Sequence, residues 1–138
     1  MGRIMGIDYG SKKTGIAVTD PMRIISTGLS TVATQEVFEF IEEYVSSEEV
    51  DVFVVGMPLT EDGKPAQIAH LVVGFIRKLQ SKYPEKKVVE WDERYSSKEA
   101  KQYIIKSGIG KKKRRDKTLV DKIAAAIILQ DYMQQNFW

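Results

Sequence analysis

Four acidic residues stand at positions where a carboxylate can do chemistry. Asp8 ends the mostly apolar stretch Arg3–Asp8. Asp92 and Glu93 follow a second such stretch, Lys87–Trp91. Both stretches are predicted to be strands, and ligands of open α/β sheets gather at the carboxyl ends of strands. These acids are therefore candidates for a shared site at one edge of a sheet.

Asp121 belongs to a predicted helix. Its neighbours at helical spacing are small or apolar: Ala124, Ala125, Ile128 and Tyr132. Asp121 is therefore expected on the face that packs against the sheet, where an isolated ionised carboxylate is costly unless it is paired or bound to metal. The alanines allow a close approach of the helix, which would bring Asp121 toward the strand ends that carry Asp8 and Glu93.

Carboxylates that cluster without a basic side chain between them repel one another. A hard divalent cation such as Mg²⁺ or Mn²⁺ removes this repulsion, because it prefers oxygen ligands. Such an ion can activate a water and stabilise the departing oxygen in phosphodiester cleavage. The acidic pattern thus predicts a divalent metal site suited to phosphate chemistry.

Each acidic residue also has an ordinary explanation. An Asp at a strand end, such as Asp8, is often a turn or cap residue. The run Asp92-Glu93-Arg94 is compatible with a surface charge cluster. Asp121 has the spacing for an ion pair with Lys117, although an acid C-terminal to the base is the less favourable order. The metal hypothesis depends on the convergence of these signals.

The composition excludes several other chemistries. The chain has 138 residues, no cysteine and one histidine, His70. Disulfide scaffolds, thiolate zinc sites and cysteine nucleophiles are therefore excluded, and a histidine metal site or Ser-His relay is disfavoured. No apolar stretch has the length of a membrane span and no signal segment is recognised, so we expect no membrane association and a cytoplasmic location.

Positive charge is distributed unevenly along the chain. The net charge is only +2, but Lys111, Lys112, Lys113, Arg114 and Arg115 form one block just before the helix that carries Asp121. Such runs are often solvated loops. Here the position suits a loop that contacts a phosphate backbone electrostatically. Lys12 and Lys13, in the first predicted turn, would add to the same field.

Hydrophobic periodicity gives the expected elements. Strands are predicted over Arg3–Asp8, Thr14–Thr19, Ile24–Val32, Asp51–Gly56 and Lys87–Trp91. Helices are predicted over Glu36–Val45 with Thr34 as N-cap, over Ala66–Tyr83, from Ser96 or Ser97 to Lys106, and over Lys117–Gln135. This order predicts a single α/β domain over residues 1–138, with a mixed five-stranded sheet and helices on both faces.

Several motifs resemble those of one known family. The segment 6–18, Gly6-Ile7-Asp8-Tyr9-Gly10-Ser11-Lys12-Lys13-Thr14-Gly15-Ile16-Ala17-Val18, resembles the opening motif of the YqgF family, also called RuvX. Gly56-Met57-Pro58-Leu59 with Gly63, the segment Asp92-Glu93-Arg94 with Ser96, Ser97 and Ala100, and Lys117 to Asp121 with Ala124, Ala125 and Ile127-Ile128-Leu129 resemble its later motifs. The resemblance spans nearly the whole chain, with the motifs in order.

The resemblance implies an RNase H-like three-layer fold and a metal-dependent nuclease that processes the 5′ end of pre-16S rRNA in ribosome biogenesis. By matching position, it implies Asp8, Glu93 and Asp121 as catalytic residues and as ligands of Mg²⁺ or Mn²⁺. Together with the charge pattern it gives nine candidate nucleic-acid contacts: Lys12, Lys13, Arg94, Lys111, Lys112, Lys113, Arg114, Arg115 and Lys117. Lys13, Met57 and Ser97 differ from the residues that are common at these positions of the family's motifs, but the three carboxylates are unaffected.

Three other functions are compatible with parts of the sequence. A Holliday junction resolvase acting on branched DNA would use the same carboxylates but would need a two-fold dimer; we expect a monomer or a weak homodimer. A nucleotide-binding module of the actin and sugar-kinase type also opens with an Asp-x-Gly hairpin, but the chain is short for its two-domain clamp. A non-catalytic RNA-binding assembly factor would bind precursor rRNA without cleaving it.

Overall fold

A computed structural model describes residues 2–58, 67–92 and 117–136, with only the backbone described for 117–120. The strands are β1 (Arg3–Asp8), β2 (Lys13–Thr19), β3 (Ser26–Ala33), β4 (Val50–Met57) and β5 (Lys87–Asp92). The helices are the 3₁₀ turn η1 (Thr34–Glu36), α1 (Val37–Ser47), α2 (Ala69–Lys82) and α5 (Lys117–Asn136). No helix in these ranges is long and apolar enough to cross a membrane.

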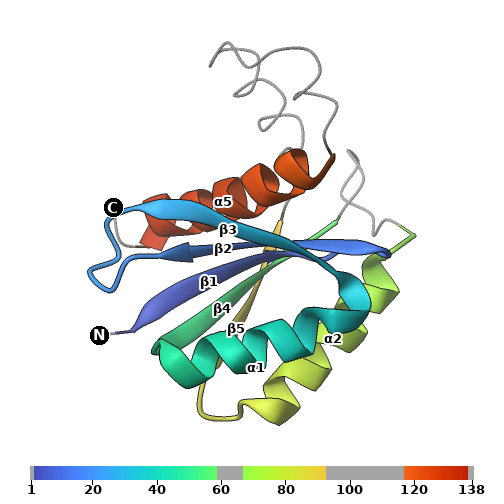
Figure 1. The fold of residues 1–138 in the computed structure, drawn as a ribbon, viewed down its shortest axis with the longest axis horizontal. Coiled ribbons are helices and arrows are strands. Elements are labelled where there is room, and N and C mark those ends of the chain that lie inside the picture. Colours follow the sequence, from blue (N-terminus) through green and yellow to red (C-terminus); the bar gives the residue numbers. More distant parts are fainter. Residues whose placement is uncertain (1, 59–66, 93–116, 137–138) are drawn as a thin grey trace.

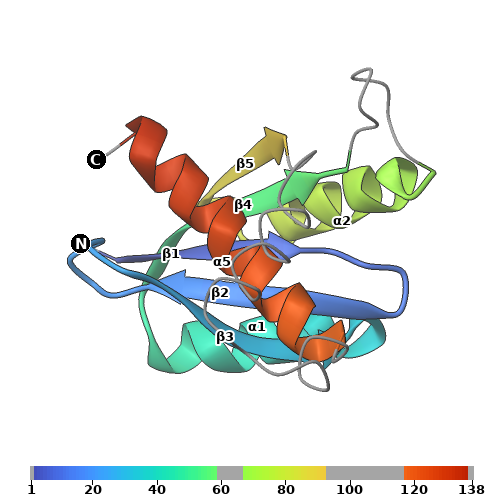
Figure 2. The same cartoon turned by 90° about the horizontal axis from the view of Figure 1, so that it is seen from above.

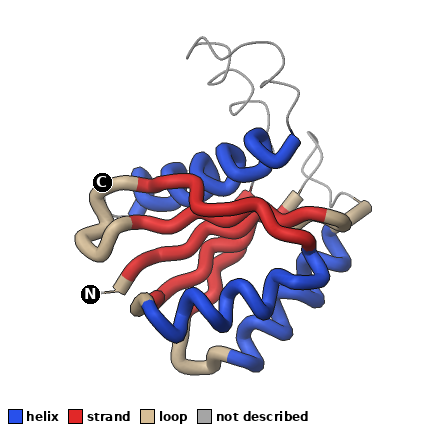
Figure 3. The backbone as a smooth tube through the Cα atoms, in the orientation of Figure 1, coloured by secondary structure: helices blue, strands red, loops and turns tan. Residues whose placement is uncertain are grey.

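The five strands form one mixed sheet in the order β3-β2-β1-β4-β5. β1, β2 and β3 are an antiparallel meander, whereas β4 and β5 run parallel to β1. The helices cover both faces, with α5 on one side and α1 and α2 on the other (Figures 1 and 3). The predicted α/β class, mixed sheet and two-sided helical cover are therefore confirmed.

Each face of the sheet has its own apolar core. The core under α1 and α2 includes Met5 and Ile7 of β1, and both are fully buried. The core under α5 includes Ile4 of β1 with Leu129 of the helix. Because side chains alternate along a strand, β1 contributes to both cores in turn, which explains its nearly continuous apolar sequence.

Helix α5 crosses the strands diagonally and is the element that completes the second layer (Figure 2). It packs on β2, β3, β1 and β4. Its buried face includes Ala124, Ala125, Ile128, Leu129 and Met133, each at most 1% exposed. The predicted sheet-facing stripe of this helix is therefore confirmed.

The predicted start of the third strand is wrong. The strand begins at Ser26 rather than Ile24, and both Ile24 and Ile25 are exposed. Their backbone N–H groups donate to Oδ1 of Asp20, each at 2.8 Å. The aspartate thereby holds these two residues in the turn, so the strand starts after them.

The predicted N-cap at Thr34 is also wrong. Thr34 opens the 3₁₀ turn, and α1 follows from Val37 without a side-chain cap. The Thr34 hydroxyl instead donates to the carbonyl oxygen of Gly10 at 2.7 Å and lies 2.9 Å from the Thr14 hydroxyl. It therefore ties the end of β3 to the β1–β2 turn. The predicted helix from Ser96 or Ser97 to Lys106 lies outside the described residues.

Candidate active site at the carboxyl end of strand β1

Asp8 is the last residue of β1 and lies on the face of the sheet that α5 covers. The alternation along β1 establishes this: Ile4 packs in the core under α5, and a Cβ at Gly6 would meet Leu129 of that helix at 2.9 Å. Two residues further on, Asp8 has the same orientation. Its side chain is half-buried. The strand thus delivers a carboxylate to the sheet edge beneath α5.

Gly15 of β2 connects Asp8 to helix α5. In the antiparallel ladder Gly15 is the direct partner of Asp8. A Cβ at Gly15 would collide with the carbonyl oxygen of Asp121 and would lie 2.6 Å from its carbonyl carbon. Only the missing side chain allows the helix backbone to rest on the strand here. The Asp121 backbone therefore lies directly over the strand residue that pairs with Asp8.

Asp121 is half-buried, in the second turn of α5. Its Oδ2 atom is shielded from solvent and accepts no hydrogen bond within the described part of the chain, although the residue has an interaction partner. A shielded carboxylate oxygen is costly unless a charge or donor compensates it. The structure thus brings two acids, 113 positions apart in sequence, to neighbouring positions on one sheet face.

Asp92 does not share the position of this pair. It ends β5, which is two strands from β1 in the sheet, a separation of about 10 Å. Its neighbour Trp91 faces α5 and makes an edge-to-face contact with Tyr132 at 5.5 Å between ring centroids. Because side chains alternate, Asp92 points to the opposite face from Asp8, and it is exposed. Asp92, a candidate by its position in the sequence, therefore does not join Asp8 and Asp121.

Glu93, the third predicted ligand, lies outside the described residues. Within the described ranges no three acidic, histidine or cysteine side chains group closely enough to hold a metal. Of the predicted trio, the structure places the Asp121 backbone over Gly15, the ladder partner of Asp8. That the three carboxylates share one ion, and the position of Glu93, stay predictions from the sequence.

Two of the predicted nucleic-acid contacts lie beside the pair. Lys12 and Lys13 are exposed at the β1–β2 turn, a few residues after Asp8. The carbonyl oxygen of Lys12 accepts a hydrogen bond from the Thr34 N–H at 2.9 Å, which fixes the turn backbone. Lys117 starts α5, and only its backbone is described. Arg94, Lys111, Lys112, Lys113, Arg114 and Arg115 lie outside the described residues.

Sequence reasoning missed the role of Gly15. A glycine inside the strand pattern Lys13–Thr19 is itself a signal that another backbone comes close. The signal does not say which backbone, because that depends on the packing of α5.

The fold is similar to that of two solved resolvase structures. It is similar to the Fowlpox virus resolvase, solved with substrate Holliday junction DNA, with a TM-score of 0.59, 14% identity and 99% coverage of both chains. It is equally similar to T. thermophilus RuvC in complex with a Holliday junction substrate, with a TM-score of 0.59, 14% identity, and coverage of 99% of this chain and 97% of that one. These neighbours define an RNase H-like fold of the RuvC type.

The sequence places the chain more narrowly. Residues 2–135 match the RuvX family, described as Holliday junction resolvase. A protein of Flavobacterium johnsoniae is 44% identical over 136 residues, covering 99% of each chain, and one of Porphyromonas gingivalis is 46% identical over 133 residues, covering 96% of each. Both are named "Putative pre-16S rRNA nuclease". The chain belongs to the RuvX family, as the motifs predicted.

Proposed function

We propose that this protein is a nuclease that hydrolyses phosphodiester bonds of precursor 16S rRNA. The relatives at 44% and 46% identity bear that name over nearly the full chain. The observation that carries the proposal is the approach of Asp121 to Asp8 through Gly15. Two carboxylates at one sheet edge, with exposed lysines beside them, suit a reaction on a phosphate.

The two carboxylates fit a divalent metal ion. They are hard oxygen donors, one from strand β1 and one from helix α5, and one of the Asp121 oxygens is shielded from water. Asp8 and Asp121 would hold Mg²⁺ or Mn²⁺, with Glu93, which follows Asp92 in the sequence, as the third ligand. When bound, the ion would supply a water of lowered pKa and charge stabilisation for the departing oxygen.

The protein's own groups position the substrate around this centre. Lys12 and Lys13 would contact phosphates through charge, which orients a strand without reading its sequence. Asp8 on the sheet and Asp121 on α5 are both half-buried, so bulk water is kept from part of each residue, which strengthens their electrostatic interactions. Arg94, Lys117 and the block of residues 111–115 would extend the same positive field along the substrate.

Cleavage of precursor rRNA tests the proposal. The 5′ precursor segment of 16S rRNA is incubated with the protein, with and without Mn²⁺. Asp8→Asn, Glu93→Gln and Asp121→Asn should each lower the cleavage rate by about 10³-fold or more, because several kcal/mol of charge stabilisation are lost. Asp131→Asn, a change of the same type ten residues further along α5, is the matched control and should cleave normally.

Two outcomes would contradict the proposal. Cleavage that continues unchanged in all three site variants would place the chemistry elsewhere or in a contaminant. Tight binding of the RNA without cleavage under any metal condition would favour the non-catalytic assembly factor. Thermal unfolding of each variant shows whether a loss of activity reflects the site or the fold.

A Holliday junction resolvase is the second candidate. It is favoured by the family description and by the two structures of similar fold that were solved with Holliday junctions. Symmetric cutting of a four-way junction needs a two-fold dimer. We infer a monomer or a weak homodimer, because the sequence shows no dedicated dimer seam. Sedimentation with and without a junction measures the oligomeric state, and a cleavage assay on the same four-way junction shows which strands are cut. A stable dimer that cuts the junction in paired strands would replace the rRNA assignment.

We also propose that residues 1–138 act as one domain and that the protein works in the cytoplasm, where precursor rRNA is processed. One sheet with a helical layer on each face supports the domain assignment. A single cooperative unfolding transition, the same by circular dichroism and by tryptophan fluorescence, tests it. Two separated transitions would contradict a single domain. Fractionation of cells tests the location, and recovery with membranes would contradict it.

A further inference from the structure

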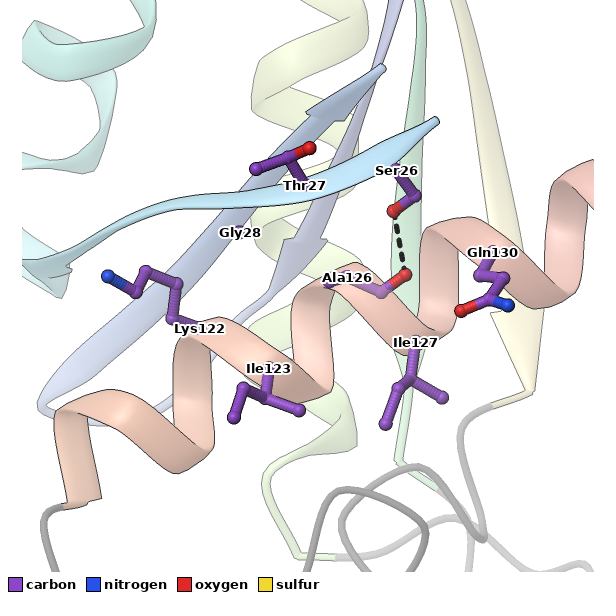
Figure 4. Close-up of a pocket in the computed structure, with 8 residues that line it drawn as sticks. All are labelled: Ser26, Thr27, Gly28, Lys122, Ile123, Ala126, Ile127 and Gln130. Atoms are coloured by element: carbon purple, nitrogen blue, oxygen red, sulfur yellow. Dashed lines mark hydrogen bonds between the residues drawn. The ribbon is translucent and has the colours of Figure 1, made fainter. Parts of the chain in front are cut away.

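A groove of about 320 Å³ lies between strand β3 and helix α5 (Figure 4). Its walls come from the two elements: Ser26, Thr27 and Gly28 from β3, and Lys122, Ile123 and Gln130 from α5. The Ser26 hydroxyl donates to the carbonyl oxygen of Ala126 at 2.9 Å and holds the two walls together. The groove is therefore a fixed feature of the packing of α5 on the sheet edge.

Lys122 is the charged side chain of this groove, and it directly follows Asp121 in the sequence. Its stem lies on β3 where the strand has no side chain: a Cβ at Gly28 would be 2.7 Å from its Cγ. In Figure 4 its amino group extends along β3 past Gly28, away from Ser26. That direction follows the strand toward its carboxyl end, at Ala33, where β3 pairs with the start of β2.

Among the described residues, no ion pair compensates the charge of Lys122. The residues lining the groove include no Asp or Glu. Thr27 and Gln130 are exposed and add neutral hydrogen-bonding groups. A cation with hydroxyl and amide groups around it is the chemistry that contacts a phosphodiester backbone. The ordinary alternative is a fully solvated lysine, whose replacement would leave RNA binding unchanged.

We propose that this groove binds the sugar-phosphate backbone of the nucleic-acid strand next to the cleaved bond, with Lys122 contacting one phosphate. The inference rests on the proposed nuclease function, because continuity with Asp121 is what connects the groove to the reacting phosphate. The contact is electrostatic and independent of base sequence. It makes Lys122 a substrate-binding residue, distinct from the carboxylates that act at the scissile bond.

Binding measurements on precursor 16S rRNA test this assignment. They use the Asp8→Asn background, so that the RNA stays intact, and compare Lys122→Gln, Lys122→Arg and Lys87→Gln. Lys87 is exposed at the start of β5, at the opposite end of that strand from Asp92, and its change removes the same charge. Lys122→Gln should weaken binding about five-fold and lower the slope of log K against log salt by about 0.7 to 0.9. Lys122→Arg should keep both values, and Lys87→Gln should resemble the parent.

A cleavage assay separates a binding role from a structural one. In the otherwise unchanged enzyme, Lys122→Gln should raise KM by a similar factor and leave kcat and the unfolding temperature unchanged. RNAs with single neutral methylphosphonate linkages near the cleaved bond locate the contact. One such linkage should weaken binding by the parent protein and have no further effect on Lys122→Gln.

The outcomes distinguish this inference from the function on which it rests. If the parent enzyme cleaves the RNA and Lys122→Gln has the same affinity, salt slope and KM, the groove assignment is wrong and the nuclease proposal stands. The groove assignment is equally wrong if Lys87→Gln loses as much affinity as Lys122→Gln, because the effect would then be one of net charge. If the parent neither binds nor cleaves the RNA, both proposals fail.

Discussion

At the scale of single residues, the candidate site depends on a glycine, Gly15, whose lack of a side chain leaves room for helix α5. Asp8 and Asp121 become neighbours because Gly15, the ladder partner of Asp8, admits the Asp121 backbone. Gly6 allows the same close approach one turn further along α5, where a Cβ would lie 3.0 Å from the carbonyl oxygen of Ala125. Two glycines on adjacent strands thus set the height of α5 above the sheet, and with it the position of the acidic pair.

Gly15→Ala should therefore damage both the packing and the activity. The new methyl group meets backbone atoms that cannot move independently of the helix, so we expect a loss of about 1–3 kcal/mol in the free energy of unfolding. Cleavage should fall further than stability does, because Asp121 is displaced. Urea denaturation and the rRNA cleavage assay measure the two effects.

Gly74→Ala is the matched control. Gly74 is exposed on α2, and a Cβ there meets nothing within 4 Å. This change should stabilise the helix by about 0.5–1 kcal/mol and leave cleavage unaltered. If Gly15→Ala behaved like Gly74→Ala in both assays, the role of Gly15 in placing Asp121 would be refuted.

At the scale of elements, the β2–β3 turn shows how one carboxylate organises the start of an edge strand. Asp20 accepts hydrogen bonds from the backbone N–H groups of Ile24, Ile25 and Met22. Arg23 within the turn adopts a left-handed φ of 57°. Its guanidinium donates to the Gly2 carbonyl at 3.0 Å and to Oδ2 of Asp51 at 3.2 Å. The turn is thereby attached to β4 as well as to its own strands.

The turn should respond to acid. The backbone hydrogen bond from Ile25, with those from Ile24 and Met22, lowers the pKa of Asp20 below its ordinary value of 3.8. A lowered folded-state pKa contributes stability that is complete above the unfolded value and is lost as the pH falls through the folded value. Asp20→Ala should therefore lower the free energy of unfolding at pH 7, with a difference that shrinks below about pH 4. Urea denaturation across this pH range measures it, and a difference that stays constant down to pH 2 would contradict the mechanism.

The sequence predicted which segments form strands and helices better than it predicted where those segments begin. Apolar periodicity located the five strands and the long helices, because burial on one or both faces determines those patterns. The start of β3 and the entry to α1 were wrong, because Asp20 and Thr34 use their oxygen atoms in tertiary or turn hydrogen bonds. Which hydrogen-bond partner such a side chain takes depends on the folded structure, and it cannot be read from the local sequence pattern.

At the scale of the whole molecule, the order of strands creates the site. Because β4 and β5 run parallel to β1, the carboxyl ends of these three strands share one edge of the sheet. Sequence reasoning anticipated this edge and the inward face of Asp121, since both follow from strand order and helical spacing. It did not anticipate that Asp92 would point to the opposite face. The place of Glu93 stays a prediction.

The shared cation is the central claim, and anomalous diffraction from crystals grown with Mn²⁺ tests it most directly. We expect a single-wavelength anomalous peak in contact with carboxylate oxygens of both Asp8 and Asp121, at about 2.0–2.2 Å, the range of compact divalent ions with oxygen ligands. Glu93 should complete the ligand set, and the peak should vanish in Asp121→Asn. A peak that touches only one of the two aspartates, or no peak at saturating Mn²⁺, would contradict the account.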